Sequence, residues 1–222
     1  MKNSNPSADS LEEEYRQRYE KALKPVALAL RDHVAGCFEG QPRIDRISAR
    51  AKDVKSFIAK AKKEEAGARK YSEPLGQIQD QIGCRIITFV LADVERIDAL
   101  IMKYFRAIEF EDHIPESEWE FGYFGRHYVL LLPADVVDGG IEPSMVPSFF
   151  ELQVKTMFQH AWSEAEHDLG YKPGDEPLTS VQKRRLAFTS AQAWGADQIF
   201  NELFEEREGS VANPPLSSSP TV

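Results

Sequence analysis

An apolar run near the middle of the chain limits the fold more than any other feature. Residues 84–91 read CRIITFVL, a segment of β-branched and other apolar side chains that contains a single charged residue, Arg85. This composition is typical of a mostly buried strand. A buried strand has to be covered by other elements, so the rest of the chain is expected to provide further strands and packing helices.

Three more segments have the character of strands. A short strand is predicted at residues 44–47, and a longer one at residues 128–132, which ends at Pro133. Residues 149–155 alternate between polar and apolar side chains, as a strand with one buried face does.

Apolar residues at helical spacing mark the remaining segments. Helices are predicted over residues 10–37 with an interruption near Pro25, over 54–66 with an end near Gly67, from Asp93 as N-cap, over 156–171 and over 178–207. Together these elements predict an α+β fold, in which a small mixed β-sheet is flanked by helices, with further helices at the N- and C-terminal sides.

Composition divides the chain into a central domain, two helical flanks and two tails. Both ends are rich in Ser, Pro and Asn and poor in large apolar groups, so they cannot offset the entropy lost on ordering. The predicted organisation is a disordered tail at 1–9, an N-terminal helical segment at 10–42, a central domain at 43–172, a C-terminal helical segment at 173–208 and a disordered tail at 209–222.

Length and cysteine usage favour a cytoplasmic protein. A chain of 222 residues can bury enough surface to fold without disulfides. The two cysteines, Cys37 and Cys84, are expected to be reduced and buried. The sequence has no run of 18 apolar residues and begins with a polar segment, so neither a membrane span nor a secretion signal is predicted.

Charge is unevenly distributed. The net charge of −9 argues against a DNA-binding protein that depends on an overall positive field. Residues 43–70, however, hold ten basic and four acidic residues. A concentrated basic segment suits a compact polyanion such as a nucleotide phosphate chain, and a solvated helix face is the alternative interpretation.

Side chains on the predicted strands are the candidates for chemistry, because the sequence contains no glycine-rich phosphate-binding motif. Asp80 lies just before the apolar strand and Arg85 within it. A carboxylate can bind Mg²⁺ and a guanidinium can stack on a base or bind phosphate. An ion pair between Asp80 and Arg85 is the structural alternative.

The alternating strand offers a second set of polar groups. Period-two alternation places Glu151, Gln153 and Lys155 on one face. Glu151 could hold Mg²⁺ and Lys155 could meet a phosphate, whereas an exposed polar face would give the same pattern without a ligand.

Two weaker motifs remain. Residues 121–128 combine aromatics, glycines, Arg and His, a pattern suited to base stacking or to filling a core. His160, Glu164 and His167 share a helix face but lack the spacing of a zinc site. His167 is expected, with Glu166, in a hydrogen-bonded network behind the active face.

Taken in order, five motifs resemble the synthetase domain of the RelA/SpoT family. They are R50-A-K52-x-x-K55-S56-F-I-x-K60, D80-x-x-G83-x-R85, G122-Y123-x-x-x-H127, E151-L-Q153-V-K155-T156 and W162-x-x-x-E166-H167-x-x-x-Y171-K172. The match covers residues 44–172, with flanking helices as in the short, single-domain alarmone synthetases. The resemblance implies a nucleotidyltransferase-like fold for the central domain.

The resemblance also implies a reaction: Mg²⁺-dependent transfer of the β,γ-pyrophosphate of ATP to the 3′-hydroxyl of GDP or GTP, which gives ppGpp or pppGpp. None of the five histidines matches the hydrolase domain of the long family members, so synthesis without hydrolysis is expected. A homo-oligomer is compatible with the terminal helices. A tRNA or a protein antitoxin ranks lower as a partner, and no membrane association is expected.

Site roles are carried over by similarity. Arg50 and Arg85 would hold the adenine, Lys52 and Lys60 would neutralise the triphosphate with Lys55 and Ser56 nearby, Asp80 and Glu151 would bind Mg²⁺, Tyr123 would stack on the acceptor base, and His127, Gln153 and Lys155 would lie near the acceptor phosphates or ribose. Glu151 would also assist deprotonation of the 3′-hydroxyl.

Two departures fall on the acceptor side. Many family members have Ser where this chain has Gly125, and Arg where it has Lys155. Lys cannot form the bidentate fork that Arg forms. The acceptor therefore stays open between guanine nucleotides, adenine nucleotides and the 3′ end of tRNA, and a non-catalytic nucleotide-binding regulator is the remaining alternative.

Overall fold

The computed structural model describes residues 8–112, 121–123, 125–171 and 177–212. Its centre is a five-stranded mixed sheet in the order β1-β4-β7-β6-β5. The strands are β1 (Ile44–Ala51), β4 (Ile82–Thr88), β5 (Ala107–Asp112), β6 (Arg126–Leu131) and β7 (Phe149–Thr156). Strands β4 and β7 are parallel and the other neighbours are antiparallel. The predicted α+β class with a small mixed sheet is confirmed.

The two strands that sequence patterns described best form the middle of the sheet. In β7 the side chains of Phe150, Leu152 and Val154 are fully buried, whereas Glu151 and Gln153 between them are only partly buried. In β4 the register sets Gly83 beside Glu151 and Arg85 beside Gln153. The charged residues of these adjacent strands therefore share one face.

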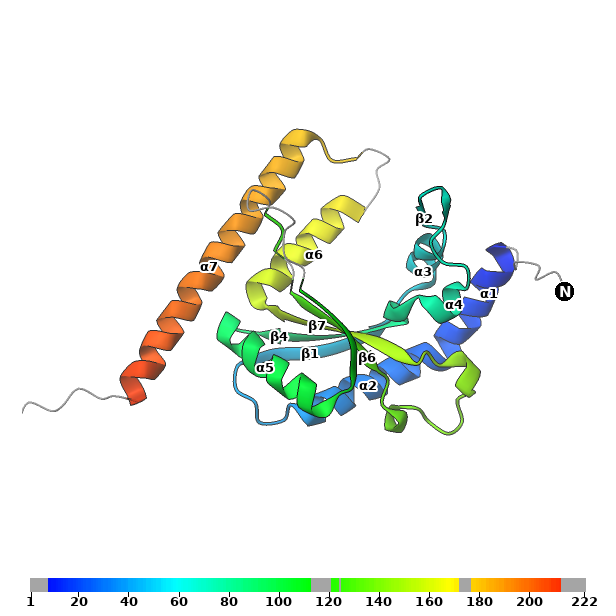
Figure 1. Cartoon of the computed structure of the whole chain (residues 1–222), viewed down its shortest axis with the longest axis horizontal. Coiled ribbons are helices and arrows are strands. Elements are labelled where there is room, and N and C mark those ends of the chain that lie inside the picture. Colours follow the sequence, from blue (N-terminus) through cyan, green and yellow to red (C-terminus); the bar gives the residue numbers. More distant parts are fainter. Residues whose placement is uncertain (1–7, 113–120, 124, 172–176, 213–222) are drawn as a thin grey trace, which may run out of the picture.

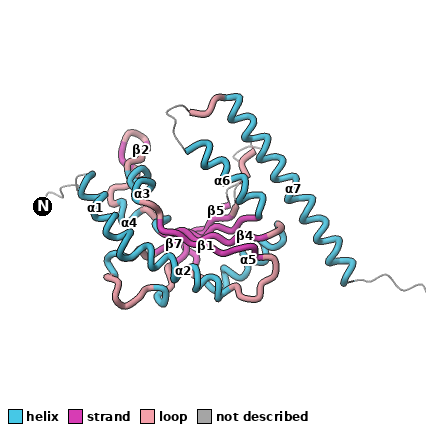
Figure 2. The backbone as a smooth tube through the Cα atoms, turned by 180° about the vertical axis from the view of Figure 1, so that it is seen from behind, coloured by secondary structure: helices cyan, strands magenta, loops and turns pink. Residues whose placement is uncertain are grey.

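Helices cover the two faces of the sheet unequally (Figures 1 and 2). Helices α2 (Lys24–Cys37) and α5 (Leu91–Tyr104) pack on one face and close the main core. Helices α3 (Val54–Ala61) and α6 (Met157–Tyr171) stand at opposite sides of the other face. Part of that second face lies between them, and this arrangement positions the site described below.

The N-terminal segment is helical throughout its described part. Helix α1 (Ala8–Arg18) continues through a π-helical stretch at Tyr19–Leu23 into α2, whose first turn contains Pro25. The π-helical turn directly before Pro25 accommodates the proline, which has no N–H to donate to the preceding turn. The interruption predicted near Pro25 is therefore a change of helix type within a helix that continues.

The prediction of a helix over residues 54–66 is wrong in its second half. Helix α3 ends at Ala61, and the two-residue strands β2 (Glu64–Glu65) and β3 (Ala68–Arg69) form a hairpin. Ala66 and Gly67, at the tip, have φ values of 51° and 81°. Positive φ at both central residues is what a two-residue hairpin turn of type I′ requires.

Two further expectations are corrected. Asp93 is not the N-cap of α5, because the helix begins at Leu91, and its carboxylate instead accepts a hydrogen bond from the Val90 amide at 3.3 Å. Strand β5 was not predicted. It lies at the edge of the sheet, and the alternation of Ile108 and Phe110 with Glu109 and Glu111 is a short strand pattern that could have indicated it.

Short helices complete the described part of the chain. They are α4 (Pro74–Gln77) and the 3₁₀ turns Gln79–Gln81, Ala134–Val136 and Pro143–Met145. In the parts described, no helix is both long enough and apolar enough to cross a membrane.

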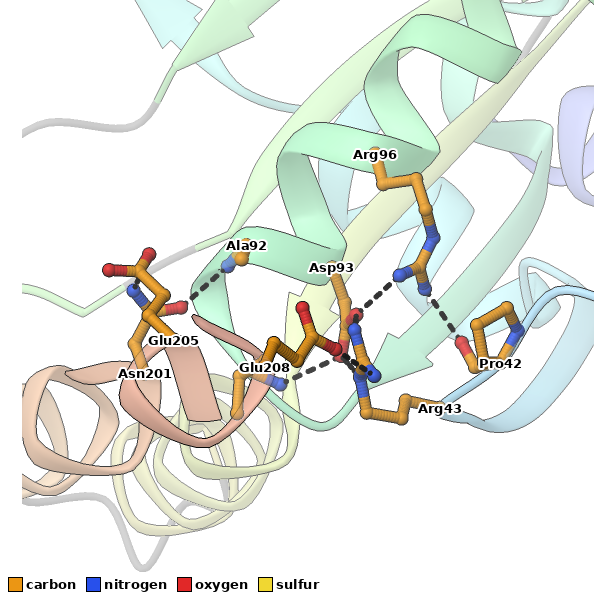
Figure 3. A network of polar contacts seen from close by, with 9 residues as sticks. Pro42, Arg43, Ala92, Asp93, Arg96, Asn201, Glu205 and Glu208 are labelled. Atoms are coloured by element: carbon orange, nitrogen blue, oxygen red, sulfur yellow. Dashed lines mark hydrogen bonds and ion pairs between the residues drawn. The ribbon is translucent and has the colours of Figure 1, made fainter. Parts of the chain in front are cut away.

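The last helix, α7 (Ser180–Ala212), is 33 residues long and runs along one side of the molecule (Figure 1). Its first half lies beside α6, where the Trp162 indole donates to the Leu186 carbonyl at 3.3 Å. In its second half Phe200 stacks on Phe158 with ring centroids 5.6 Å apart, Asn201 accepts a hydrogen bond from the Ala92 amide at 2.8 Å and Glu208 pairs with Arg43 at 2.8 Å (Figure 3). Polar contacts therefore dock α7 against the start of α5 and the segment before β1.

Candidate functional site

A cavity of about 560 Å³ is lined by residues of the sheet and of helices α3 and α6. Its walls come from β1, α3, the turn before β4, β4 itself, β7 and α6. Eight of the residues predicted from sequence line it: Arg50, Lys52, Ser56, Lys60, Asp80, Arg85, Glu151 and Gln153. The two carboxylates and the four basic side chains thus converge on one space.

Asp80 is held at the entrance to β4 by two ammonium groups. Its Oδ2 accepts from the Nζ of Lys52 at 2.7 Å and lies 3.0 Å from the Nζ of Lys60. Its Oδ1 is buried and has no hydrogen-bond partner in the described part of the chain. The alternative ion pair with Arg85 is not the arrangement found, because Asp80 pairs with lysines.

Glu151 lies on β7, beside Gly83 of β4. Its Oε2 accepts from the Gln153 amide at 2.8 Å, and its Oε1 lies 3.4 Å from Nδ1 of His127. Burial acts to raise the pKa of Glu151, but these hydrogen bonds and nearby positive charge outweigh it and hold the pKa at about 2. Glu151 is therefore a carboxylate at any physiological pH.

Arg85 connects the sheet to α6. Its Nε donates to the Gln153 side chain at 3.3 Å, and its Nη1 donates to Glu164 at 2.7 Å and lies 3.1 Å from Nδ1 of His160. Burial, followed by the charge of Arg85, lowers the pKa of His160. His160 and Glu164 thus contact the guanidinium. Among the described residues no group of three or more His, Cys, Asp or Glu side chains could hold a metal ion.

Four predicted site residues lie outside the cavity. Lys55 is exposed on α3, and His127 does not line the cavity although its Nδ1 lies 3.4 Å from Oε1 of Glu151. Lys155 is 4% exposed and donates to Ser163 of α6 at 3.0 Å. Tyr123 is 8% exposed, and its hydroxyl donates to Asp197 of α7 at 2.5 Å.

The burial of Lys155 has an electrostatic consequence. Desolvation, together with the charge of Arg85, lowers the pKa of Lys155 to about 8. The polar face that was predicted to include Glu151, Gln153 and Lys155 is therefore accessible only as far as Gln153. Beyond it, α6 covers the strand.

Sequence patterns missed several residues of the site. Asp53 is the N-cap of α3 and accepts from the Ser56 amide at 3.0 Å, a pattern that the sequence Asp-x-x-Ser could have indicated. His167 lines the cavity and does not lie behind it. Asp197 sits in a helix of mixed composition, where no motif marks it.

Comparison with known proteins agrees with this geometry. A family signature described as "Region found in RelA / SpoT proteins" matches residues 49–176. This is more than half of the chain, so the protein belongs to the RelA/SpoT family. The motifs that carried the resemblance lie within the matched segment.

Individual relatives are similar over most of their length. The GTP pyrophosphokinase YjbM of Bacillus subtilis is 30% identical over 165 residues, which are 72% of each chain. The small alarmone synthetase 1 of Bacillus subtilis bound to its product pppGpp matches with a TM-score of 0.69 and 24% identity, over 86% of this chain and 98% of the other. A GTP pyrophosphokinase family protein of Streptococcus pneumoniae matches with a TM-score of 0.67 and 24% identity, over 89% and 95%. The fold is that of the small alarmone synthetases.

Proposed function

We propose that this protein is a GTP pyrophosphokinase. It transfers the β,γ-pyrophosphate of ATP to the 3′-hydroxyl of GDP or GTP, releases AMP and forms ppGpp or pppGpp. The observation that carries the proposal is the cavity in which Asp80 and Glu151 meet Lys52, Lys60 and Arg85. The 30% identity to a GTP pyrophosphokinase supports the same assignment.

The cavity suits a nucleoside triphosphate as donor. Lys52 lies between β1 and α3 and Lys60 in the last turn of α3, and both reach the cavity and supply two positive charges for the phosphate chain. Arg50 and Arg85 lie on the adjacent strands β1 and β4, and we assign them to the adenine. A planar guanidinium can stack on a base, so two of them can hold adenine from both sides.

Mg²⁺ is part of the proposal, and the residues present fit it. Mg²⁺ is commonly bound through one or two carboxylates together with substrate phosphates. Asp80 and Glu151 line the same cavity, and Asp80 has a buried oxygen without a hydrogen-bond partner among the described residues. We assign these two carboxylates to the ion, which when bound would neutralise charge on the phosphates.

In the transfer step, the 3′-oxygen of the acceptor forms a bond to the β-phosphorus of ATP. The bond from that phosphorus to the oxygen shared with the α-phosphate breaks, and AMP leaves with the electron pair. Negative charge grows on the phosphate oxygens, and Lys52, Lys60 and Arg85 stabilise it. The 3′-hydroxyl loses its proton as the new bond forms, and we assign Glu151 to orient this hydroxyl and to take up the proton, which then passes to solvent. The pKa of about 2 makes Glu151 a weak base in the free protein, so orientation is the larger part of its task.

On the acceptor side we assign Tyr123 to base stacking and His127, Gln153 and Lys155 to the phosphates or ribose. Lys55 and Ser56 are assigned to the donor side, where Ser56 lines the cavity. The proposal includes synthesis without hydrolysis, in the cytoplasm. A homo-oligomer stays a prediction, which light scattering would test.

The decisive assay incubates the purified protein with radiolabelled ATP, Mg²⁺ and one acceptor at a time, and separates the products. The acceptors tested are GMP, GDP, GTP, adenine nucleotides and tRNA. Labelled ppGpp or pppGpp is the expected product, and labelled tRNA, labelled adenine alarmone or no product at all would replace the proposal by one of the alternatives. Incubation with unlabelled ppGpp tests for hydrolysis.

Two variants test the metal assignment. Asp80→Asn and Glu151→Gln remove one charge each without changing size, and both are expected to lose nearly all turnover while staying folded. Asp45→Asn is the matched control, because this carboxylate lies on β1 outside the cavity. Near-full turnover in either cavity variant would refute the role of that carboxylate in binding Mg²⁺.

A further inference from the structure

Asp197 is a fully buried carboxylate in the middle of α7. Its Oδ2 accepts hydrogen bonds from two hydroxyls, those of Tyr123 and Thr156. Its Oδ1 is buried and has no partner among the described residues. Burying a carboxylate is costly, so one that sits at the meeting point of three separate segments calls for an explanation.

Thr156 ties this carboxylate to the catalytic strand. Thr156 is the last residue of β7 and precedes α6. Its Oγ1 accepts from the Gln159 amide at 3.0 Å, and its own amide donates to the Gln159 side chain at 2.8 Å, which is a capping box. Because Oγ1 of Thr156 accepts the hydrogen bond from Gln159, the hydroxyl proton of Thr156 is available to donate to Asp197. Asp197 is thereby fixed relative to β7, because Thr156 lies on that strand five residues after Glu151.

Anchoring of α7 alone does not account for Asp197. Two exposed contacts farther along the helix, from Asn201 to the Ala92 amide and from Glu208 to Arg43, already attach α7 to the rest of the molecule (Figure 3). Asp197 differs from them in being buried and in binding Tyr123, the residue assigned to the acceptor base.

We propose that Asp197 is a positioning residue for the acceptor nucleotide, which it serves by fixing the Tyr123 ring through the tyrosine hydroxyl. This inference rests on the proposed function. A tyrosine whose hydroxyl is bonded and whose side chain is 8% exposed has lost most of its rotational freedom before the nucleotide arrives, so the acceptor does not have to order it. ATP binds in the cavity, which Tyr123 does not line, and is not affected.

The test compares steady-state constants for the two substrates. In Asp197→Ala the KM for GDP and for GTP should rise about tenfold, the change expected when one hydrogen bond to a charged group is lost. The KM for ATP should stay within about twofold of the wild-type value. Asp197→Asn keeps an oxygen that can accept from both hydroxyls, and it should restore the acceptor KM.

Two further variants separate positioning from general loosening of α7. Asn201→Ala removes the contact with Ala92 one turn along the same helix, and it should leave both KM values unchanged. Tyr123→Phe removes only the hydroxyl and should reproduce the acceptor effect. Combined with Asp197→Ala it should add little more, because both changes break the same bond.

The outcomes distinguish this inference from the proposed function. If the wild-type protein forms no ppGpp or pppGpp, both fail. If the wild-type protein is active but Asp197→Ala leaves the acceptor KM unchanged, or raises both KM values equally, or acts additively with Tyr123→Phe, only the positioning role is overturned. Thermal melting of each variant, measured in parallel, shows that the protein assayed is folded.

Discussion

Gly125 lies directly against Lys155: a Cβ atom at residue 125 would overlap the Cγ of Lys155 and the carbonyl oxygen of Val154. These two positions are the ones where the chain departs from the motifs of many RelA/SpoT proteins. The departures are therefore neighbours in space, and the backbone of β7 leaves room for no side chain at 125. We interpret them as one coupled change in the packing between residue 125 and β7.

Gly125→Ser should therefore destabilise the protein. Inserting atoms against a backbone carbonyl forces a shift of the strand, and overpacking of this kind costs about 1–3 kcal/mol. Chemical denaturation measures the change in the free energy of unfolding. Gly195→Ala is the matched control, since nothing lies within 4 Å of an added Cβ there and Ala is favoured over Gly inside a helix. A stable Gly125→Ser protein would contradict the close contact with β7.

Lys155 should make stability depend on pH in the alkaline range. Burial and then Arg85 lower its pKa to about 8, from 10.5 for an ordinary lysine. Between these values the unfolded chain binds more protons than the folded one, so the contribution of Lys155 makes stability rise with pH. Below about pH 8 both states are protonated and the buried charge is most unfavourable.

Lys155→Met tests whether Lys155 makes stability rise with pH, because Met fills a similar space without the charge. The variant should be more stable than the wild-type protein at pH 7, and the difference should shrink as the pH rises from about 8 to about 10. The two proteins have to be compared at each pH, because Cys84 also affects the pH dependence of stability. Burial raises the pKa of Cys84 to about 12, so its contribution makes stability fall as the pH rises, equally in both proteins. A difference that stays constant over this range would show that Lys155 is not buried as a cation.

The parts of the fold and of the cavity that could be predicted are those that depend on local sequence patterns. Strand β4 was predictable because it is a run of apolar and β-branched residues, and β7 because its apolar residues alternate with polar ones. The alternation in β7 also places Glu151 and Gln153 on one face. The motifs around Lys52 and Asp80 were predictable because each is local. The cavity joins them only through the pairing of β1 with β4 and of β4 with β7.

The features that sequence reasoning missed depend on tertiary context. The hairpin after α3 was hidden because Lys62, Lys63 and the glutamates of β2 have good helix propensity, and only the positive φ at Ala66 and Gly67 ends the pattern. In the sequence, Asp197 cannot be distinguished from an ordinary polar residue of a helix. Its role comes from hydroxyls that lie 41 and 74 residues away in sequence.

Asp53 should matter for donor binding through the stability of α3. Its carboxylate caps the helix that presents Ser56 and Lys60 to the cavity. Loss of an N-cap costs about 1 kcal/mol, so Asp53→Ala should lower the free energy of unfolding by that amount and raise the KM for ATP more than the KM for the acceptor. Asp53→Asn, which caps equally well, is the control. An equal effect of both variants would assign the role of Asp53 to its charge.

Glu151 should contribute to stability in a way that disappears in acid. Burial would raise its pKa, but the hydrogen bonds from His127 and Gln153 and the charge of Lys60 lower it to about 2, against 4.5 for an ordinary glutamate. A depressed pKa contributes stability that is complete above the unfolded value and is lost as the pH falls from about 4.5 towards 2.

Glu151→Gln removes the titrating group and keeps the amide–oxygen geometry. At pH 7 the variant should be less stable than the wild-type protein, by an amount on the order of 2 kcal/mol. The gap should close as the pH falls below about 4.5, because the wild-type carboxylate then takes up its proton and loses its favourable contacts. Urea unfolding over this pH range measures both proteins. A gap that is the same at pH 7 and in acid would mean that Glu151 is held by packing and not by the charges around it, and the low basicity assigned to it in the transfer step would no longer hold.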